Sequence, residues 1–266
     1  AIVWNLPKHI LAKLPKLKII FSLGAGVDHI LKLDDYKSIP IVRIKDPLMG
    51  ELMYYYVLSQ ILNYQIGIND YKIAQNKKLW IKEILPTFNK DLTIGILGMG
   101  YLGSIVAKSL KRNNYKIIGY KKNKLKMSKF KIYYGDQLNK FLQSADVLVN
   151  ILPNTKDTIN FINSKVLSLM KKKCLLISIG RGSTVNENDL IKQLKKNKFF
   201  YASLDVFQDE PLSKRNILWS LPNVNITPHV ASITLIDSAI NLIYERYLKY
   251  KKTKKIKSDV NLNNGY

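Results

Sequence analysis

Three polar residues in the second half of the chain are of the types that bind anions and transfer protons: Arg181, Glu210 and His229. Each follows a short apolar run that is typical of a buried β-strand. In an open parallel sheet, ligands bind beyond the carboxyl ends of the strands. We therefore expect these side chains to converge on one cleft, in which an arginine can hold an anion and a histidine beside a carboxylate can transfer a proton.

A glycine motif earlier in the chain has the spacing of a phosphate-binding turn. Its sequence is Gly98-Met-Gly-Tyr-Leu-Gly103, and it follows an apolar strand, opens a helix and precedes a second strand, as a dinucleotide-binding motif requires. Gly98 would permit the tight turn, Gly100 would let the backbone approach a pyrophosphate, and Gly103 would let the helix pack on the strand. The backbone N–H groups of Tyr101 and Leu102 would face the phosphates at the positive end of the helix dipole. The alternative is an ordinary glycine turn.

The end of the second strand indicates which dinucleotide would bind. An acidic residue about 20 positions after the first glycine usually binds a free ribose 2′-hydroxyl, but no acid occurs from Ser104 to Gly135. Lys121 and Lys122 lie there instead, and two lysines attract a 2′-phosphate. The sequence therefore predicts NADP, with NADPH as the reductant. The alternative is that both lysines reflect a general enrichment in lysine, in which case NAD would also serve.

The elements that must position these residues alternate between strand and helix. Strand-like apolar runs recur at 18–23, 92–97, 115–120, 146–150, 174–178, 201–205 and 224–227. Helical patterns occur at 49–65, 101–112 and 235–249. Strands separated by helices imply right-handed crossovers and a parallel sheet. The expected fold class is α/β, with a doubly wound parallel sheet of the Rossmann type.

The composition sets limits on the class of protein. The 266 residues allow one large domain or two ordinary ones, and 47% of them are hydrophobic, as in globular proteins. The single cysteine, Cys174, excludes an internal disulfide and a CxxC zinc cluster, and we expect no metal site. No apolar run has the length of a membrane helix. We expect a cytoplasmic protein without a membrane partner, with Cys174 as a small buried hydrophobe.

The net charge of +24 raises the question of nucleic-acid binding. Only five of the 43 basic residues are arginine, whereas proteins that read bases or grip phosphates favour arginine. Isoleucine, asparagine and tyrosine are abundant together with lysine, which is typical of AT-rich codon usage. We therefore expect no nucleic-acid partner. The alternative assigns the lysine-rich tail at 249–257 to a nucleic acid or an anionic membrane.

The chain as a whole resembles the D-isomer-specific 2-hydroxyacid dehydrogenases, and within them the glyoxylate/hydroxypyruvate reductase A branch. The resemblance extends from Trp4 to the end of the chain. Its motifs, in order, are Leu23-Gly-Ala-Gly-Val-Asp28, Met49-Gly-Glu51, Gly95-Ile-Leu-Gly-Met-Gly-Tyr-Leu-Gly103, Leu152-Pro-Asn-Thr155, Arg181-Gly182, Leu204-Asp-Val-Phe-Gln-Asp-Glu-Pro211 and Thr227-Pro-His-Val-Ala231.

This resemblance implies hydride transfer between a nicotinamide and a small 2-oxoacid. Arg181 matches the arginine that binds the substrate carboxylate and polarises the ketone oxygen. His229 matches the general acid, and Glu210 matches the carboxylate that orients the imidazole and favours its protonated form. Because a nucleotide sensor needs no proton donor, this set argues against the alternative of a non-catalytic nucleotide-sensing protein. Another small 2-oxoacid, including a phosphoglycerate-type compound, is the alternative within the same chemistry.

By the same resemblance, further residues would contact the ligands. Asp205 would contact the nicotinamide amide, and the cofactor would be lined by Leu152, Pro153, Thr158 and Ile179. The backbone N–H groups of Ala25 and Gly26 would bind the substrate carboxylate, and Trp4 would wall the substrate pocket. Trp80 also matches an aromatic position of this branch. Core packing is the alternative for both tryptophans.

The resemblance also implies a division into domains. Residues 1–67 and 236–266 would form a discontinuous substrate domain, and residues 68–235 the dinucleotide-binding domain. The match begins inside a usual family member, so the smaller α/β domain would be shortened at its N-terminus. This reflects either a fragment or a genuinely shortened product. Family members pair through the nucleotide domain, which predicts a homodimer.

Overall fold

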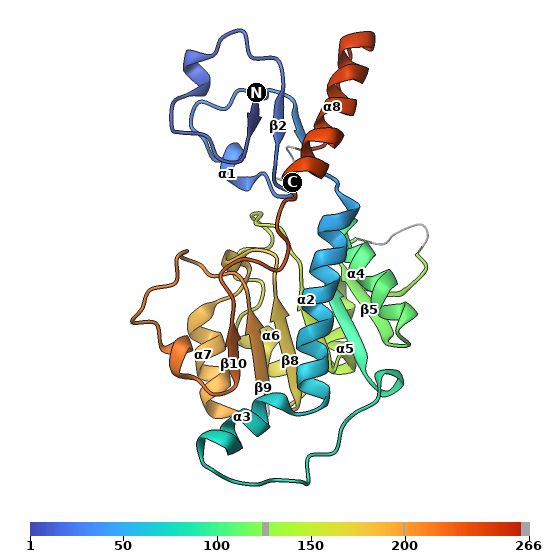
Figure 1. The fold of residues 1–266 in the computed structure, drawn as a ribbon, viewed down its shortest axis with the longest axis vertical. Helices are drawn as coiled ribbons and strands as arrows, with labels where there is room; N and C mark the ends of the chain where they lie inside the picture. Colours follow the sequence, from blue (N-terminus) through green and yellow to red (C-terminus); the bar gives the residue numbers. More distant parts are fainter. Residues whose placement is uncertain (124–127, 199, 262–266) are drawn as a thin grey trace. The chain divides into compact units, whose positions relative to one another are not determined.

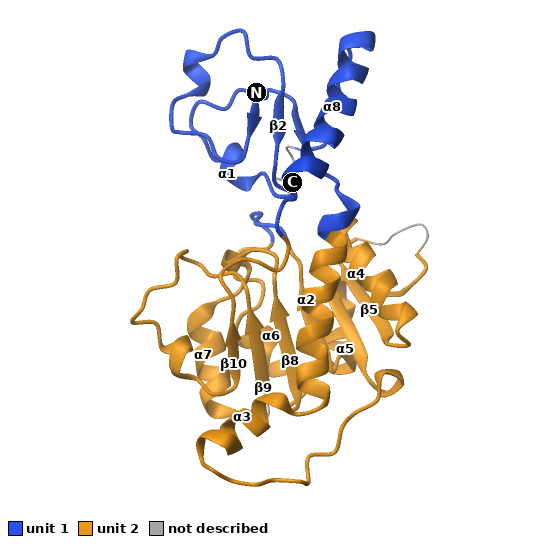
Figure 2. Ribbon diagram, in the orientation of Figure 1, with its two compact units in different colours: residues 1–49, 153–157, 233–266 blue, residues 50–152, 158–232 orange. Residues whose placement is uncertain are grey.

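The computed structural model describes residues 1–123, 128–198 and 200–261, which divide into two compact units (Figures 1 and 2). The smaller unit comprises residues 1–49, 153–157 and 233–266, and the larger comprises 50–152 and 158–232. The chain therefore passes between the units several times, and each unit is assembled from separate stretches of sequence.

Within the described residues, the larger unit holds a parallel sheet of seven strands in the order β10-β9-β8-β7-β4-β5-β6. The strands are β4 (Thr93–Leu97), β5 (Lys116–Lys121), β6 (Lys131–Tyr134), β7 (Val147–Asn150), β8 (Cys174–Ser178), β9 (Phe200–Leu204) and β10 (Val224–Ile226). The chain order reverses between β4 and β7, so that β5 and β6 lie on one side of β4 and the later strands on the other. This is the doubly wound order of a Rossmann sheet, which confirms the expected fold class.

Helices cover both faces of this sheet because its strands are apolar on both sides. They are α2 (Pro47–Gln65), α3 (Ile68–Asn76), α4 (Tyr101–Arg112), α5 (Leu138–Ser144), α6 (Ser164–Leu169) and α7 (Glu187–Lys196), with short 3-10 turns η2 (Asn89–Asp91), η3 (Gly135–Gln137), η4 (Gly182–Thr184) and η5 (Ile217–Ser220). In β8, Leu175 and Ile177 pack in the core that includes α2 and α4, whereas Cys174 and Leu176 pack in the core with α5, α6 and α7. Successive side chains of a strand point to opposite faces, which produces this alternation.

Helix α2 changes the predicted division of the chain. From Gly50 onward it belongs to the larger unit, although the sequence assigned residues 1–67 to the smaller one (Figure 2). The reason is its buried face, because Met53, Val57 and Ile61 pack in the core of the large sheet. Residues 153–157 likewise group with the smaller unit rather than with the residues around them.

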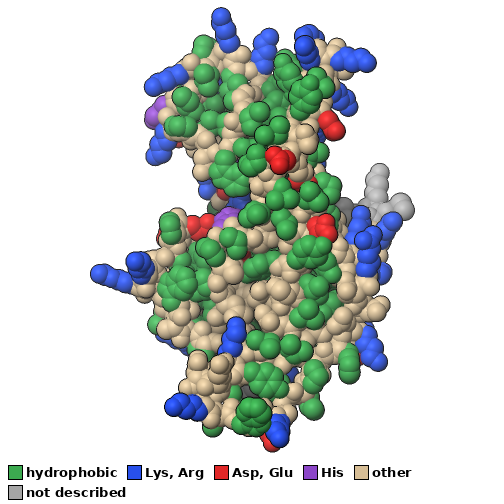
Figure 3. Space-filling model, in the orientation of Figure 1, with side chains coloured by type: hydrophobic (Ala, Val, Ile, Leu, Met, Phe, Trp, Pro, Cys, Tyr) green, Lys and Arg blue, Asp and Glu red, His purple; other side chains and the backbone are tan. Residues whose placement is uncertain are grey.

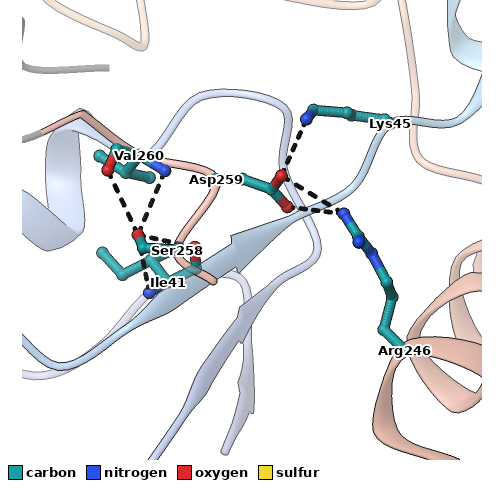
Figure 4. A network of polar contacts seen from close by, with 6 residues as sticks. All are labelled: Ile41, Lys45, Arg246, Ser258, Asp259 and Val260. Atoms are coloured by element: carbon teal, nitrogen blue, oxygen red, sulfur yellow. Dashed lines mark hydrogen bonds and ion pairs between the residues drawn. The ribbon is translucent and has the colours of Figure 1, made fainter. Parts of the chain in front are cut away.

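The smaller unit contains a parallel sheet with the order β1-β2-β3, formed by β1 (Ile2–Val3), β2 (Ile20–Ser22) and β3 (Ile41–Arg43). It also holds η1 (Leu11–Lys13), α1 (Asp28–Leu31) and α8 (Ile236–Thr253). The segment after α8 is fastened to β3, since the Asp259 N–H donates to the Ile41 carbonyl at 2.9 Å. The Asp259 carboxylate in turn pairs with Lys45 at 2.8 Å and with Arg246 at 3.0 Å (Figure 4).

Three further observations bear on the sequence predictions. Cys174 is fully buried, and burial raises the pKa of its thiol to about 12, as expected of a small core residue. Among the described helices, none combines the length and the apolar character needed to cross a bilayer. Lys and Arg side chains stand at several separate places on the face drawn in Figure 3.

Candidate active site

The predicted site residues of the larger unit follow the carboxyl ends of its strands. Gly98 follows β4, Lys122 follows β5, Arg181 follows β8, Asp205 follows β9 and His229 follows β10. Because the strands are parallel, all of these ends lie at one edge of the sheet (Figure 1). The loops after β4 and β7 flank the reversal of strand order, where open α/β sheets bind ligands.

The glycine motif has the geometry that a dinucleotide requires. Gly98 has a φ of +96°, and a Cβ there would lie 2.5 Å from the Ile151 carbonyl oxygen. A Cβ on Gly103 would lie 2.2 Å from the Gly98 oxygen, so only glycine lets α4 approach the strand this closely. A Cβ on Gly100 would meet nothing within 4 Å. The backbone at Gly100 therefore borders open space at the N-terminus of α4, where an anion is favoured.

The first turn of α4 carries no negative charge that would repel a phosphate. No side chain in the described part of the chain caps the helix at Gly100, and its first turn carries no acidic residue. Lys121 is half-buried at the end of β5, and Lys122 after it is exposed. The residues present therefore fit a phosphorylated dinucleotide.

His229 and Glu210 form a close pair. The His229 Nδ1 lies 2.8 Å from one carboxylate oxygen of Glu210, and the side chains are 44% and 36% exposed. The other carboxylate oxygen of Glu210 accepts the Phe207 N–H at 2.9 Å, which fixes the carboxylate on its own loop. Because an ionised carboxylate only accepts hydrogen bonds, Nδ1 is the donor. The opposite ring nitrogen, Nε2, is then the atom that can exchange a proton with a ligand.

The loop bearing Arg181 packs directly against the loop bearing Glu210. A Cβ on Gly182 would lie 1.9 Å from the carbonyl carbon of Phe207, so the two backbones touch at a position where only glycine fits. The Arg181 guanidinium donates one hydrogen bond to the Gly180 carbonyl at 2.9 Å, and the side chain is half-buried. The structure thus brings Arg181, Glu210 and His229 to neighbouring loops, as the sequence predicted.

A buried polar network holds the Arg181 loop in place, and sequence reasoning missed it. The Asn150 amide donates to the Ser178 hydroxyl at 3.1 Å and to the Thr184 hydroxyl at 2.8 Å. The Thr184 hydroxyl donates to the Arg181 carbonyl at 2.6 Å. The polar residues Asn150 and Ser178 at the ends of β7 and β8 were the sequence signal for this network, because buried polar groups need hydrogen-bond partners.

The remaining predicted residues fall into two groups. Leu152 and Thr158 are half-buried in the larger unit, and Ile179 is buried in the core beside α2, so any ligand contact of Ile179 uses its backbone. Pro153, Trp4, Ala25 and Gly26 lie in the smaller unit. There, the Trp4 carbonyl accepts from His29 Nε2 at 2.6 Å.

Core packing, the alternative for both tryptophans, is wrong. The Trp80 side chain is 89% exposed and that of Trp4 is 52% exposed. Trp80 lies in an extended segment after α3 that also exposes Leu79, Ile81, Leu85 and Phe88.

Comparison with known proteins is consistent with this geometry. Residues 58–231 match the family described as D-isomer specific 2-hydroxyacid dehydrogenase, NAD binding domain. The whole chain is 36% identical to glyoxylate/hydroxypyruvate reductase A of Photorhabdus laumondii, over 87% of that protein. A Xanthobacter autotrophicus D-isomer specific 2-hydroxyacid dehydrogenase, solved with NADPH and MES, is similar over 100% of this chain and 84% of its own, at 31% identity and a TM-score of 0.93. The NADPH-dependent glyoxylate/hydroxypyruvate reductase of Sinorhizobium meliloti, solved with NADP and sulfate, has the same identity and TM-score over 100% of this chain and 85% of its own.

The doubly wound sheet, the glycine turn and the polar loops at one edge define a Rossmann-type oxidoreductase. The matches then place the protein within that class. The chain belongs to the D-isomer specific 2-hydroxyacid dehydrogenase family.

The contact between the Arg181 and Glu210 loops predicts a strong effect of a single methyl group. Gly182→Ala would force the two backbones apart, and we expect a loss of about 2 kcal/mol or more, seen as a fall in Tm of roughly 5 °C. Gly100→Ala is the matched control, since its Cβ meets no atom, and its Tm should equal that of the wild type. Equal Tm values for all three proteins would show that the loops do not pack in this way.

Proposed function

We propose that the protein reduces glyoxylate to glycolate and hydroxypyruvate to glycerate with NADPH. The observation that carries the proposal is the His229–Glu210 pair, held on a loop that neighbours the Arg181 loop at the carboxyl edge of a dinucleotide-binding sheet. The names of the relatives support the choice of substrate, because both the Photorhabdus and the Sinorhizobium proteins are glyoxylate/hydroxypyruvate reductases.

Each residue of the set has a role that its chemistry allows. The Arg181 guanidinium would bind the substrate carboxylate and polarise the ketone oxygen through charge-assisted hydrogen bonds. Bound NADPH would supply a hydride to the carbonyl carbon. His229 would give the Nε2 proton to the ketone oxygen, which becomes the hydroxyl of the product. Glu210 would hold the imidazole through Nδ1 and favour its protonated form.

The cofactor would bind along the carboxyl edge of the large sheet. The glycines at 98, 100 and 103 and the N–H groups of Tyr101 and Leu102 would receive the pyrophosphate. Lys121 and Lys122 would bind the 2′-phosphate of NADP, which two solved relatives contain as NADPH or NADP. Leu152, Pro153, Thr158, Ile179 and Asp205 would contact the rest of the dinucleotide.

The smaller unit carries the other residues that the resemblance assigns to substrate binding. The N–H groups of Ala25 and Gly26 would bind the carboxylate, and Trp4 would limit the size of the substrate. On this proposal the larger unit is the dinucleotide-binding domain and the smaller unit the substrate domain.

Consumption of NADPH with glyoxylate, hydroxypyruvate and pyruvate, measured in parallel at 340 nm, tests the substrate. We expect turnover of the first two and much weaker turnover of pyruvate. Preferred turnover of another 2-oxoacid would replace the proposed substrate within the same chemistry. Absence of turnover together with tight NADPH binding would favour a nucleotide-sensing protein and contradict the proposal.

Substitution of the proton donor and of the anion-binding residue tests the assigned roles. His229→Ala and Arg181→Ala should each lower kcat/KM by at least about 100-fold, because each removes stabilisation of the transition state. Their Kd for NADPH should stay close to that of the wild type. His9→Ala and Arg215→Ala, which alter exposed residues outside the site, serve as matched controls. Near-normal turnover in either site variant would contradict its role.

The lysines after β5 predict the cofactor preference. The double variant Lys121→Ala/Lys122→Ala should raise KM for NADPH roughly tenfold and leave KM for NADH unchanged, since it removes charge that faces only the 2′-phosphate. Lys251→Ala/Lys252→Ala on α8 removes the same net charge elsewhere and controls for bulk electrostatics. A wild type that prefers NADH, or equal changes in both double variants, would contradict this assignment.

We also propose that the protein forms a homodimer through the segment 79–88. This segment exposes five large apolar side chains, with Trp80 at 89% and Leu85 at 85% exposure, and apolar patches of this kind mark interfaces. The partner would be a second copy, as the resemblance to the family implies.

Light scattering after size exclusion tests the dimer. The wild type should have twice the mass of one chain, and Leu85→Asp should shift it toward the monomer because a carboxylate would be buried unpaired. Leu14→Asp, at an exposed leucine of the smaller unit, should remain dimeric. A monomeric wild type would refute the proposal.

A further inference from the structure

The loop that carries His229 is tied to a single buried aspartate. The backbone N–H groups of three successive residues donate to Asp205: His229 to its carbonyl at 2.8 Å, Val230 to Oδ1 at 2.8 Å and Ala231 to Oδ2 at 2.9 Å. Asp205 is 1% exposed and follows β9, where its own N–H donates to the Ser178 carbonyl at 2.9 Å. The carboxylate therefore links the His229 loop to the sheet.

His229 needs such a link because its backbone is in a left-handed conformation. Its φ is +56°, which costs a residue with a side chain roughly 1 kcal/mol or more. A conformation of this kind persists only where its surroundings determine it. If the hydrogen bonds to Asp205 loosen, the backbone can relax, and the imidazole then moves relative to Glu210.

Two hydroxyl groups, linked by hydrogen bonds, connect Asp205 to helix α2. The Thr227 hydroxyl lies 2.5 Å from Asp205 Oδ1, and the Tyr56 hydroxyl lies 2.8 Å from the Thr227 hydroxyl. The ionised carboxylate can only accept, so Thr227 uses its one hydrogen there. Tyr56 must then be the donor to Thr227, so the direction of both hydrogen bonds is fixed.

The position of Tyr56 suits this role. It lies on the face of α2 that packs against the large sheet, and its ring joins the core of that face. Burial, together with the charge of Asp205, raises the pKa of its phenol to about 12, so the donating proton is retained at physiological pH. The described hydrogen bonds of the Tyr56 and Thr227 hydroxyls lead to Asp205, so both residues act on His229 through Asp205.

We propose that Tyr56 and Thr227 are positioning residues, which fix Asp205 and thereby hold His229 in its left-handed conformation against Glu210. The inference deepens the proposed function, since it concerns the proton donor of that reaction. The resemblance implies another role for Asp205, namely contact with the nicotinamide amide. In this structure its carboxylate already accepts three hydrogen bonds. A carboxylate can accept about four, so one acceptor position remains for the amide of a nicotinamide.

The histidines of the chain provide a direct readout, because there are only three, His9, His29 and His229. In a ¹⁵N-imidazole spectrum of the full chain, the signal absent from His229→Ala identifies His229. In the wild type we expect a slowly exchanging Nδ1–H, protected by its hydrogen bond to Glu210. Tyr56→Phe and Thr227→Val should each broaden that signal or speed its exchange several-fold, and Thr227→Ser should restore it.

Kinetics on the same variants supply the second readout. Tyr56→Phe should lower kcat roughly three- to tenfold, the effect of one lost hydrogen bond, while KM and the Kd for NADPH stay unchanged. Tyr55→Phe is the matched control, since its exposed hydroxyl bonds Glu51 on the same helix and is not one of the two that connect Asp205 to α2. An unchanged Nδ1–H signal in both Tyr56→Phe and Thr227→Val, or equal losses in Tyr55→Phe, would overturn the inference. Because the spectrum needs no turnover, this result is separate from any failure of the proposed reaction.

Discussion

The structure of the site depends on one buried carboxylate. Asp205 directly follows β9, the strand beside the edge strand β10, and is 1% exposed. A charge that is removed from water must be compensated by hydrogen-bond donors. Two backbone N–H groups and one hydroxyl provide that compensation. The same donors belong to the loop of His229, so the cost of burying the carboxylate is offset only when that loop is in place. The site and the sheet therefore form as one unit.

The parallel sheet explains why distant residues become neighbours. Each strand ends at the same edge, and each crossover returns the chain to the opposite edge. The loops that follow β8, β9 and β10 thus become neighbours, although nearly fifty residues separate Arg181 from His229. Close approach of the loops then requires positions without a side chain, and Gly98, Gly103 and Gly182 meet backbone atoms at distances that no Cβ allows.

The sequence predicted the central elements well because their signals are local. The run 174–178 matches β8, and the helix 101–112 matches α4 residue for residue. The strand β6 was missed, since its four residues, Lys131 to Tyr134, carry neither a long apolar run nor a clear alternation. Helix α2 was recognised as a helix and assigned to the smaller domain, whereas its buried face packs on the large sheet, because a sequence pattern shows which residues are apolar and not which sheet they cover.

The sequence likewise indicated some residues of the candidate site and not others. Arg181, Glu210 and His229 follow strands and could be found from their types. The polar side chain of Asn150 at the end of β7 was a signal, but the partners of Asn150, Thr184 and Tyr56 could not be assigned, because their hydrogen bonds join segments that are far apart in the sequence. Asp205 lies between these cases, since the resemblance to the family indicated it, but only the three donors around it show which hydrogen bonds its carboxylate accepts.

In the proposed reaction, His229 would deliver a proton while a hydride reaches the carbonyl carbon of a 2-oxoacid. A single-turnover experiment with glyoxylate and NADPH that carries deuterium at both C4 positions of the nicotinamide, with the product followed by NMR, tests this step. We expect glycolate that carries deuterium at C2, formed at least about 100-fold more slowly by His229→Asn than by the wild type. Deuterated glycolate formed at the same rate by both proteins, or glycolate without deuterium, would contradict it.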